Sequence, residues 1–204
     1  MSAIDIYELD GFKKNYIESK FQEIETSFGR RLKGLINRIE SKEGIYSYKK
    51  YVKKHLMNIM LLFYFRANKE VEELCKLDNY YLEKLSEKIF KNYKFYIIHS
   101  EDHSFMLSDS YISIYDEKNR SLEELVDSKE GMILIPVSSK YYILFTNKMT
   151  RRERVLHVFK NNRYSYYDID FYNKIIYRNS YIFIVGRYKD YYLKMRDEIL
   201  SKIL

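Results

Sequence analysis

The spacing of apolar residues changes near Asn92, and this change decides which folds the chain can adopt. Between residues 12 and 39 apolar side chains recur every three or four positions, as they do along one face of an amphipathic helix. After Asn92, short runs of β-branched and aromatic residues are bounded by polar turn residues, which is typical of strands. A helical half followed by a strand-rich half predicts an α+β fold.

The helical half is expected over residues 11–90. We predict a long amphipathic helix over 12–39 that stops near Gly44, a second helix over 47–67, and shorter helices over 69–76 and 80–90. The end of the second helix is apolar on nearly all sides, so this helix should be buried at the centre.

The second half is expected to form a mainly antiparallel sheet over residues 93–185. The predicted strands are 94–98, 105–109, 111–115, 131–137, 141–145, 154–159 and 181–185. The charged interval between the third and fourth strands should lack regular structure. Asp168 should cap a short helix that ends near Tyr177, and an amphipathic helix over 188–204 should close the fold. We expect one domain over 1–204, in which the helical subregion 11–90 packs on the sheet subregion 93–204.

The number of cysteines and the length of the apolar runs limit the compartment. The single cysteine, Cys75, allows neither an internal disulfide nor a multi-cysteine metal cluster, and its pattern predicts a buried structural thiol in a reducing cytoplasm. Residues 1–10 are acidic, unlike a signal peptide. The most apolar run, 56–65, has half of the ~20 residues that a membrane span needs. We therefore expect a cytoplasmic protein with no membrane partner and no cofactor.

Short segments across the chain resemble an uncharacterised bacterial family, the domain of unknown function numbered 4238. The segment 105–112, Phe-Met-Leu-Ser-Asp-Ser-Tyr-Ile, is similar to its "Phe-x-x-Ser-Asp-x-Pro-Val" motif, and 135–140, Ile-Pro-Val-Ser-Ser-Lys, to its "Pro-Leu-Ser-Pro-Lys" motif. Residues 170–176 followed by 181–183 resemble its closing helix and aromatic strand. The chain lacks the family's N-terminal "His-Tyr-Val-Pro" segment, and Tyr111 replaces its proline after Ser-Asp. The resemblance carries no established reaction.

Two sets of residues fit nuclease chemistry. Asp109, or alternatively Asp102, followed by Asp116 and Lys118 matches an Asp, then Asp-x-Lys order, in which carboxylates would hold magnesium beside a lysine. Arg152 and His157 have the Arg-x4-His spacing of a helical RNase motif, but their context predicts a strand. The first set also has a structural interpretation. Ser108-Asp109 suits a turn whose side chains bond to local backbone, and Asp116-Glu117-Lys118 suits an exposed turn.

Residues 136–140, with two serines and a lysine, could bind a phosphate. A tight hairpin is the simpler interpretation of this segment.

The four histidines, His55, His99, His103 and His157, form no recognised pattern of metal ligands. His99 and His103 lie with Glu101 and Asp102 in a polar stretch that could bind a metal. A solvated loop is the simpler interpretation, and we expect no metal site.

Basic residues are clustered in two places. Residues 147–163 contain one acid, Glu153, and six cations: Lys148, Arg151, Arg152, Arg154, Lys160 and Arg163. A second patch consists of Lys49, Lys50, Lys53 and Lys54, and five tyrosines lie beside the two patches: Tyr48, Tyr51, Tyr164, Tyr166 and Tyr167. Cations with aromatic neighbours suit contacts to a phosphate backbone and stacking of bases. A Lys- and Tyr-rich composition, as an AT-rich genome produces, explains the same pattern without function.

These observations favour a non-enzymatic binding protein of bacterial or phage origin that binds nucleic acid or an acidic protein surface. Its setting would be phage–host conflict, in defence or its inhibition. The alternative is a nuclease-like effector or toxin that uses one of the two residue sets above. A third interpretation is a structural module that assembles with copies of itself.

Overall fold

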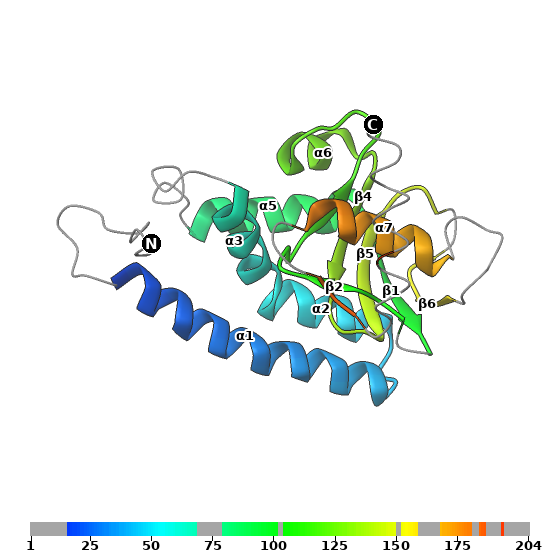
Figure 1. Ribbon diagram of the computed structural model, residues 1–204, viewed down its shortest axis with the longest axis horizontal. Coiled ribbons are helices and arrows are strands. Elements are labelled where there is room, and N and C mark those ends of the chain that lie inside the picture. Colours follow the sequence, from blue (N-terminus) through cyan, green and yellow to red (C-terminus); the bar gives the residue numbers. More distant parts are fainter. Residues whose placement is uncertain are drawn as a thin grey trace. The chain divides into compact units, whose positions relative to one another are not determined.

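The structure, a computed structural model, describes residues 16–68, 79–101, 104–149, 152–158, 168–180, 184–186 and 193. They fall into two compact units that divide between Ser86 and Glu87, inside helix α5 (Asn79–Asn92). Helices come first along the chain and most strands follow (Figure 1), which confirms the α+β class. That the two units form a single domain stays a prediction.

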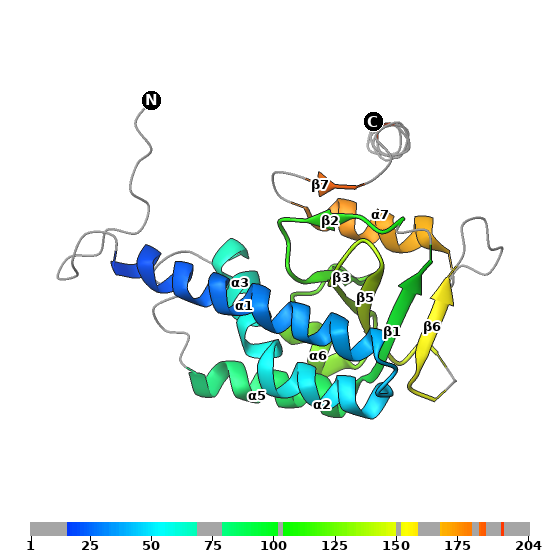
Figure 2. The same cartoon turned by 90° about the horizontal axis from the view of Figure 1, so that it is seen from below.

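The first unit begins with a helical hairpin of α1 (Tyr16–Glu40) and α2 (Ile45–His55). The helix predicted over 12–39 is confirmed in α1, where Leu35 and Ile39 are buried. The chain then reverses at Gly44, whose φ of 100° lies in the region that favours glycine. As a result α2 runs back along α1 (Figure 2).

The helix predicted over 47–67 is broken at Leu56, so the prediction of one continuous helix is wrong. The backbone φ of Leu56 is −121°, and a new helix, α3 (Met57–Asn68), starts directly after it. The guanidinium of Arg31 donates a hydrogen bond of 3.0 Å to the carbonyl oxygen of His55, the last residue before the break. The expected burial of the apolar part is confirmed, because α3 buries Met57, Met60, Leu61, Phe63 and Phe65. The helix expected over 69–76, with Cys75, lies outside the described residues.

A five-stranded sheet forms the centre of the second unit. Its order is β3 (Ser113–Tyr115), β4 (Met132–Pro136), β5 (Tyr141–Thr146), β1 (Lys94–Ser100) and β6 (Val155–Val158). All neighbours are antiparallel except β1 and β6, which are parallel. The predicted, mainly antiparallel sheet is thus confirmed. A separate two-stranded sheet joins β2 (Leu107–Ser108) to β7 (Ile184–Val185).

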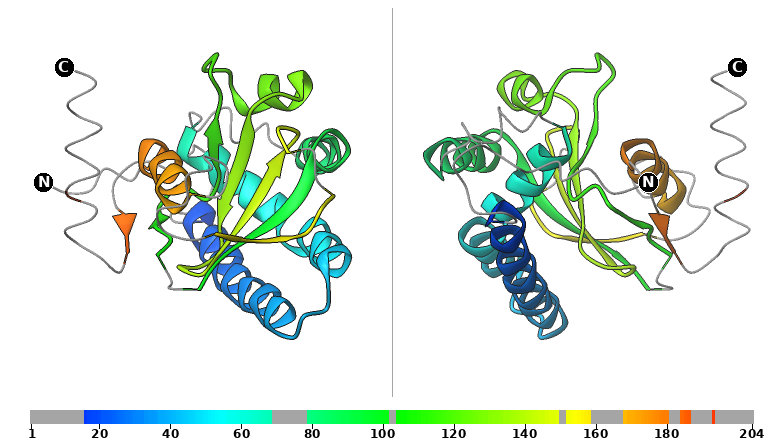
Figure 3. Two further views of the ribbon diagram at one scale, coloured as in Figure 1. Left: turned by 90° about the vertical axis from the view of Figure 1, so that its right-hand side faces the viewer. Right: turned by 60° about the vertical axis from the view of Figure 1, so that its left-hand side comes forward.

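Helix α7 (Ile169–Asn179) covers one face of this sheet (Figure 3). Successive residues of a strand point to opposite faces, so Tyr96 and Ile98 of β1 share a buried cluster with α7. Phe95 lies on the other face, against Phe90 of α5. The side chain of Asp168 accepts a hydrogen bond from the amide of Asp170, which confirms the predicted cap. The closing helix expected over 188–204 lies outside the described residues, Leu193 apart.

The side chain of Asn173 fastens α7 to the segment that follows β1. Its Nδ2 donates to the carbonyl oxygen of Ser104 at 2.9 Å, and its Oδ1 accepts from the amide of Met106 at 3.0 Å. The hydroxyl of Tyr142 also donates to that Oδ1, at 3.1 Å. Asn173 is fully buried, so these bonds satisfy a polar group that would otherwise be costly to bury.

The interval between β3 and β4 contains a helix, α6 (Leu122–Ser128), so the prediction that it lacks regular structure is wrong. The Ser121 hydroxyl accepts from the amide of Glu124, and the Glu124 carboxylate accepts from the amide of Ser121. This reciprocal capping box is written in the sequence as Ser-x-x-Glu before an apolar residue.

Candidate nucleic-acid interface

The positive charge of the chain is concentrated in residues 29–55, the C-terminal part of α1 and the whole of α2. Residues 29–55 contain nine Lys and Arg residues and two Glu residues, a formal charge of +7, and the net charge of the whole chain is also +7. The rest of the chain is therefore balanced overall. Lys and Arg make up nine of these 27 residues, against 36 of 204 in the whole chain.

One face of α2 presents three of these nine cations to solvent. Lys50, Lys53 and Lys54 are exposed, whereas Val52 is buried on the opposite side. Tyr46 precedes Lys50 by four positions and Lys53 by seven, so the three share one face of the helix. The Tyr46 side chain is 79% exposed, more than the other exposed large apolar residues. We call these four residues, Tyr46, Lys50, Lys53 and Lys54, the α2 stripe.

Helix α1 adds the exposed cations Arg30, Arg31 and Lys33. Of the two acids in residues 29–55, Glu43 accepts hydrogen bonds from Ser47 and Arg38. The Ser47 hydroxyl, and after it Arg38, lower the pKa of Glu43. Among the residues that the structure describes, no carboxylate forms an ion pair with Arg30, Lys33 or the three lysines of the stripe. Their charge is therefore available to an anion from outside.

The seam between the two helices is also electropositive. The pKa of His55 is lowered, first by burial and then by the charges of Lys54, Arg31 and Arg38. The guanidinium of Arg38 lies 4.9 Å from the centre of the Tyr51 ring. A positive potential that disfavours a further proton on His55 favours a bound phosphate.

Base stacking needs exposed rings, and the two described tyrosines that were predicted beside the lysines are not exposed. Tyr48 is 2% exposed, so its ring is not available to a base, and Tyr51 is half-buried in the seam of the hairpin. On α2 the exposed tyrosine is Tyr46, which was not singled out from the sequence. Its spacing to Lys50 and Lys53 was the signal that could have found it. Lys49 is half-buried, and Tyr164, Tyr166 and Tyr167 lie outside the described residues.

The second predicted basic segment is described in part. Arg152 and Arg154 are exposed near the start of β6. Lys148 is bound to Glu117 at 3.0 Å and lies 5.2 Å from the centre of the Tyr115 ring. Arg151, Lys160 and Arg163 lie outside the described residues. This segment therefore supports the interface less than the hairpin does.

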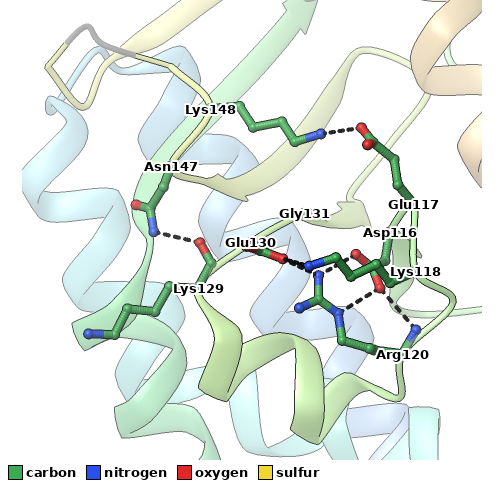
Figure 4. Close-up of a pocket in the computed structure, with 9 residues that line it drawn as sticks. All are labelled: Asp116, Glu117, Lys118, Arg120, Lys129, Glu130, Gly131, Asn147 and Lys148. Carbon is green, nitrogen blue, oxygen red and sulfur yellow. Dashed lines mark hydrogen bonds and ion pairs between the residues drawn. The ribbon is translucent and has the colours of Figure 1, made fainter.

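Two of the three residues of the first nuclease hypothesis, Asp116 and Lys118, line a pocket of about 400 Å³ (Figure 4). Asp116 is 4% exposed and accepts three hydrogen bonds from Arg120: one from its amide, one from Nε and one from Nη2, at 2.6–2.9 Å. These bonds hold the pKa of Asp116 well below its usual range. Lys118 pairs with Glu130 at 3.1 Å. Asp109 follows β2, in the other sheet, and does not line the pocket. A magnesium ion at Asp116 would have to displace the guanidinium.

The structural interpretations of the other motifs are confirmed where they are described. The Ser108 hydroxyl accepts from the amide of Ser110, as expected of a turn. Ser138 bonds to the amides of Lys140 and Tyr141 in the hairpin between β4 and β5. His157 lies on strand β6 and Arg152 precedes it, which confirms that the second nuclease pair stands in a strand context.

Comparisons with protein-family models, with curated proteins and with solved structures find no match for this chain. The resemblance to the bacterial family numbered 4238 stays a prediction. Among the described helices, none has the length and apolar character that crossing a bilayer requires.

Proposed function

We propose that this chain is a non-enzymatic protein that binds nucleic acid through the α1–α2 hairpin. The observation that carries the proposal is the charge of +7 on residues 29–55, in which no described carboxylate neutralises Lys33 or the three lysines of the α2 stripe. Cations that replace condensed counterions along a phosphate backbone bind it with a strong dependence on salt. The bacterial or phage setting and a role in phage–host conflict belong to the same proposal and rest on the family resemblance.

The α2 stripe favours single strands over duplexes. Three lysines on one helix face can contact successive phosphates of a nucleic-acid strand. The exposed ring of Tyr46 on the same face offers a surface for an unpaired base. Stacking on an aromatic side chain contributes about 1–3 kcal/mol per base and needs no particular sequence. In a duplex the bases are already stacked on one another, so Tyr46 adds little there.

A gel-shift and cleavage assay on labelled single- and double-stranded DNA and RNA, with magnesium and with EDTA, tests the proposal. We expect salt-sensitive binding that is stronger for single strands, with no cleavage in either buffer. Metal-dependent cleavage would contradict it and favour the nuclease alternative. The double variant Asp109→Ala and His157→Ala would then show whether those residues are responsible. Failure to bind any of the four nucleic acids at low salt would leave an acidic protein surface as the partner.

A further inference from the structure

Two histidines that are far apart in the sequence meet in the second unit. The parallel register of β1 and β6 places His99 directly beside His157. Residues paired in this way point to the same face of a sheet, and the two Nδ1 atoms are 2.9 Å apart. This face is opposite to the one that α7 covers, since Ile98 and Leu156, the residues before them, share the buried cluster of α7.

A carboxylate completes the group. Glu101 comes two residues after His99, just past the end of β1, and its Oε1 is 4.0 Å from Nδ1 of His157. One ligand atom from each of the three residues lies within 4.8 Å of the other two. Glu101 is 67% exposed, so its side chain can close the remaining distance without disturbing a packed core.

From this geometry we propose that His99, His157 and Glu101 bind a divalent first-row transition-metal ion. Imidazole nitrogens bind zinc at about 2.0–2.1 Å. At that bond length, two nitrogens 2.9 Å apart subtend about 90° at the metal, the angle of adjacent octahedral positions. Two imidazoles and one carboxylate on one side of an ion leave its other positions open to water or to a further ligand.

The surroundings of the histidines favour a fixed site over a chance encounter. The ring of His99 stacks on Tyr141 of the neighbouring strand, with 5.0 Å between ring centres and 23° between ring planes. Tyr141 is buried, so it holds the His99 ring in one orientation. His157 is on the edge strand β6 and is 54% exposed, so an ion can reach it from solvent. Metal sites of this kind depend on such support of the ligands.

Isothermal titration calorimetry of the untagged full chain with Zn²⁺, and separately with Ni²⁺, tests this site. We expect one ion per chain. His157→Ala should weaken binding by at least about 100-fold, because loss of a ligand costs more than loss of a supporting residue, which costs 10–100-fold. Glu101→Gln, which is exposed and should leave the fold intact, should weaken it in the same direction. His55→Gln removes a histidine from outside the group and should leave the affinity unchanged.

Absence of binding in the full chain would overturn the proposal. So would an affinity that is unchanged in both His157→Ala and Glu101→Gln, because the ion would then be bound elsewhere. Circular dichroism of each variant shows whether it is folded. If His157→Ala is unfolded, the affinity of Glu101→Gln alone tests the site. The nucleic-acid proposal does not depend on this result, since its residues lie in the first unit.

Discussion

The hydroxyl of Tyr51 donates a hydrogen bond of 3.0 Å to the carbonyl oxygen of Arg31, and this bond joins α2 to α1 at the middle of the hairpin. It passes over Gly34, where a Cβ would overlap the Tyr51 hydroxyl. A second hydrogen bond joins the same two helices: the guanidinium of Arg31 donates to the carbonyl oxygen of His55. These two hydrogen bonds fix α1 and α2 relative to each other, and with them the backbone positions of the basic residues.

Gly34→Ala should destabilise the first unit. Alanine favours a helix by about 1 kcal/mol over glycine, but overpacking against a bonded tyrosine costs about 1–3 kcal/mol. We expect a net loss of about 1 kcal/mol in the free energy of unfolding, measured by urea denaturation. The same change in a Tyr51→Phe background should cost less, because the overlapping oxygen is gone. An equal loss in both backgrounds would contradict the close approach.

Asp116→Asn should lower stability by about 2 kcal/mol at neutral pH, because hydrogen bonds to a charged group contribute about 1.5–3 kcal/mol. Arg120 lowers the pKa of Asp116 in the folded protein. The unfolded chain therefore takes up the proton first, and the contribution is complete above about pH 5 and fades as the pH falls below about 4. Denaturation at pH 7 and at pH 3 should show a smaller difference in stability between the two proteins at pH 3. A difference that is the same at both pH values would contradict a contribution from the ionised form of Asp116.

Asn173→Ala should destabilise the second unit by more than a surface substitution does. It leaves the buried amide of Met106 and the carbonyl of Ser104 without the partner they have in the structure. An unsatisfied buried group costs about 1–3 kcal/mol. Thermal unfolding against Asn147→Ala, an exposed asparagine that also bonds to backbone carbonyls, provides the comparison. We expect the larger fall in melting temperature for Asn173→Ala, and the reverse order would contradict the role of this contact.

Elements defined by a local pattern could be predicted from the sequence. The helix α1 follows from its apolar spacing, and β5 and α7 follow from an apolar run and from the cap Asp168. The helix α6 could have been predicted as well, since Ser121 and Glu124 have the spacing of a capping box. The break at Leu56 could not, because it coincides with a hydrogen bond from Arg31, 24 positions before His55.

The two candidate sites also differ in whether their residues are close together in the sequence. The lysines of α2 are neighbours in the sequence, so their cluster was visible before the structure. Which tyrosine accompanies them depends on the direction of each side chain, and burial removes Tyr48 while it leaves Tyr46 exposed. His99 and His157 are 58 positions apart, and only the parallel pairing of β1 with β6 brings them together.

Tyr46→Ala should weaken binding to single strands and leave binding to duplexes nearly unchanged. The loss of one stacked base corresponds to about 1–3 kcal/mol. Fluorescence anisotropy with a labelled strand, alone and annealed to its complement, measures both affinities. Tyr80→Ala removes another exposed tyrosine, 66% exposed on α5, and serves as the control. Equal losses on single strands and duplexes would exclude stacking on Tyr46.

The most direct test of the hairpin as the interface is the salt dependence of single-strand binding in a variant with Lys50, Lys53 and Lys54 changed to Gln. Each lost phosphate contact lowers the slope of log affinity against log salt by about 0.7, so the slope should fall by about 2. The control changes Lys84, Lys88 and Lys91 to Gln, three exposed lysines on one face of α5 that remove the same charge. The account predicts a reduced slope in the first variant and an unchanged slope in the control. An equal reduction in both, or in neither, would contradict it.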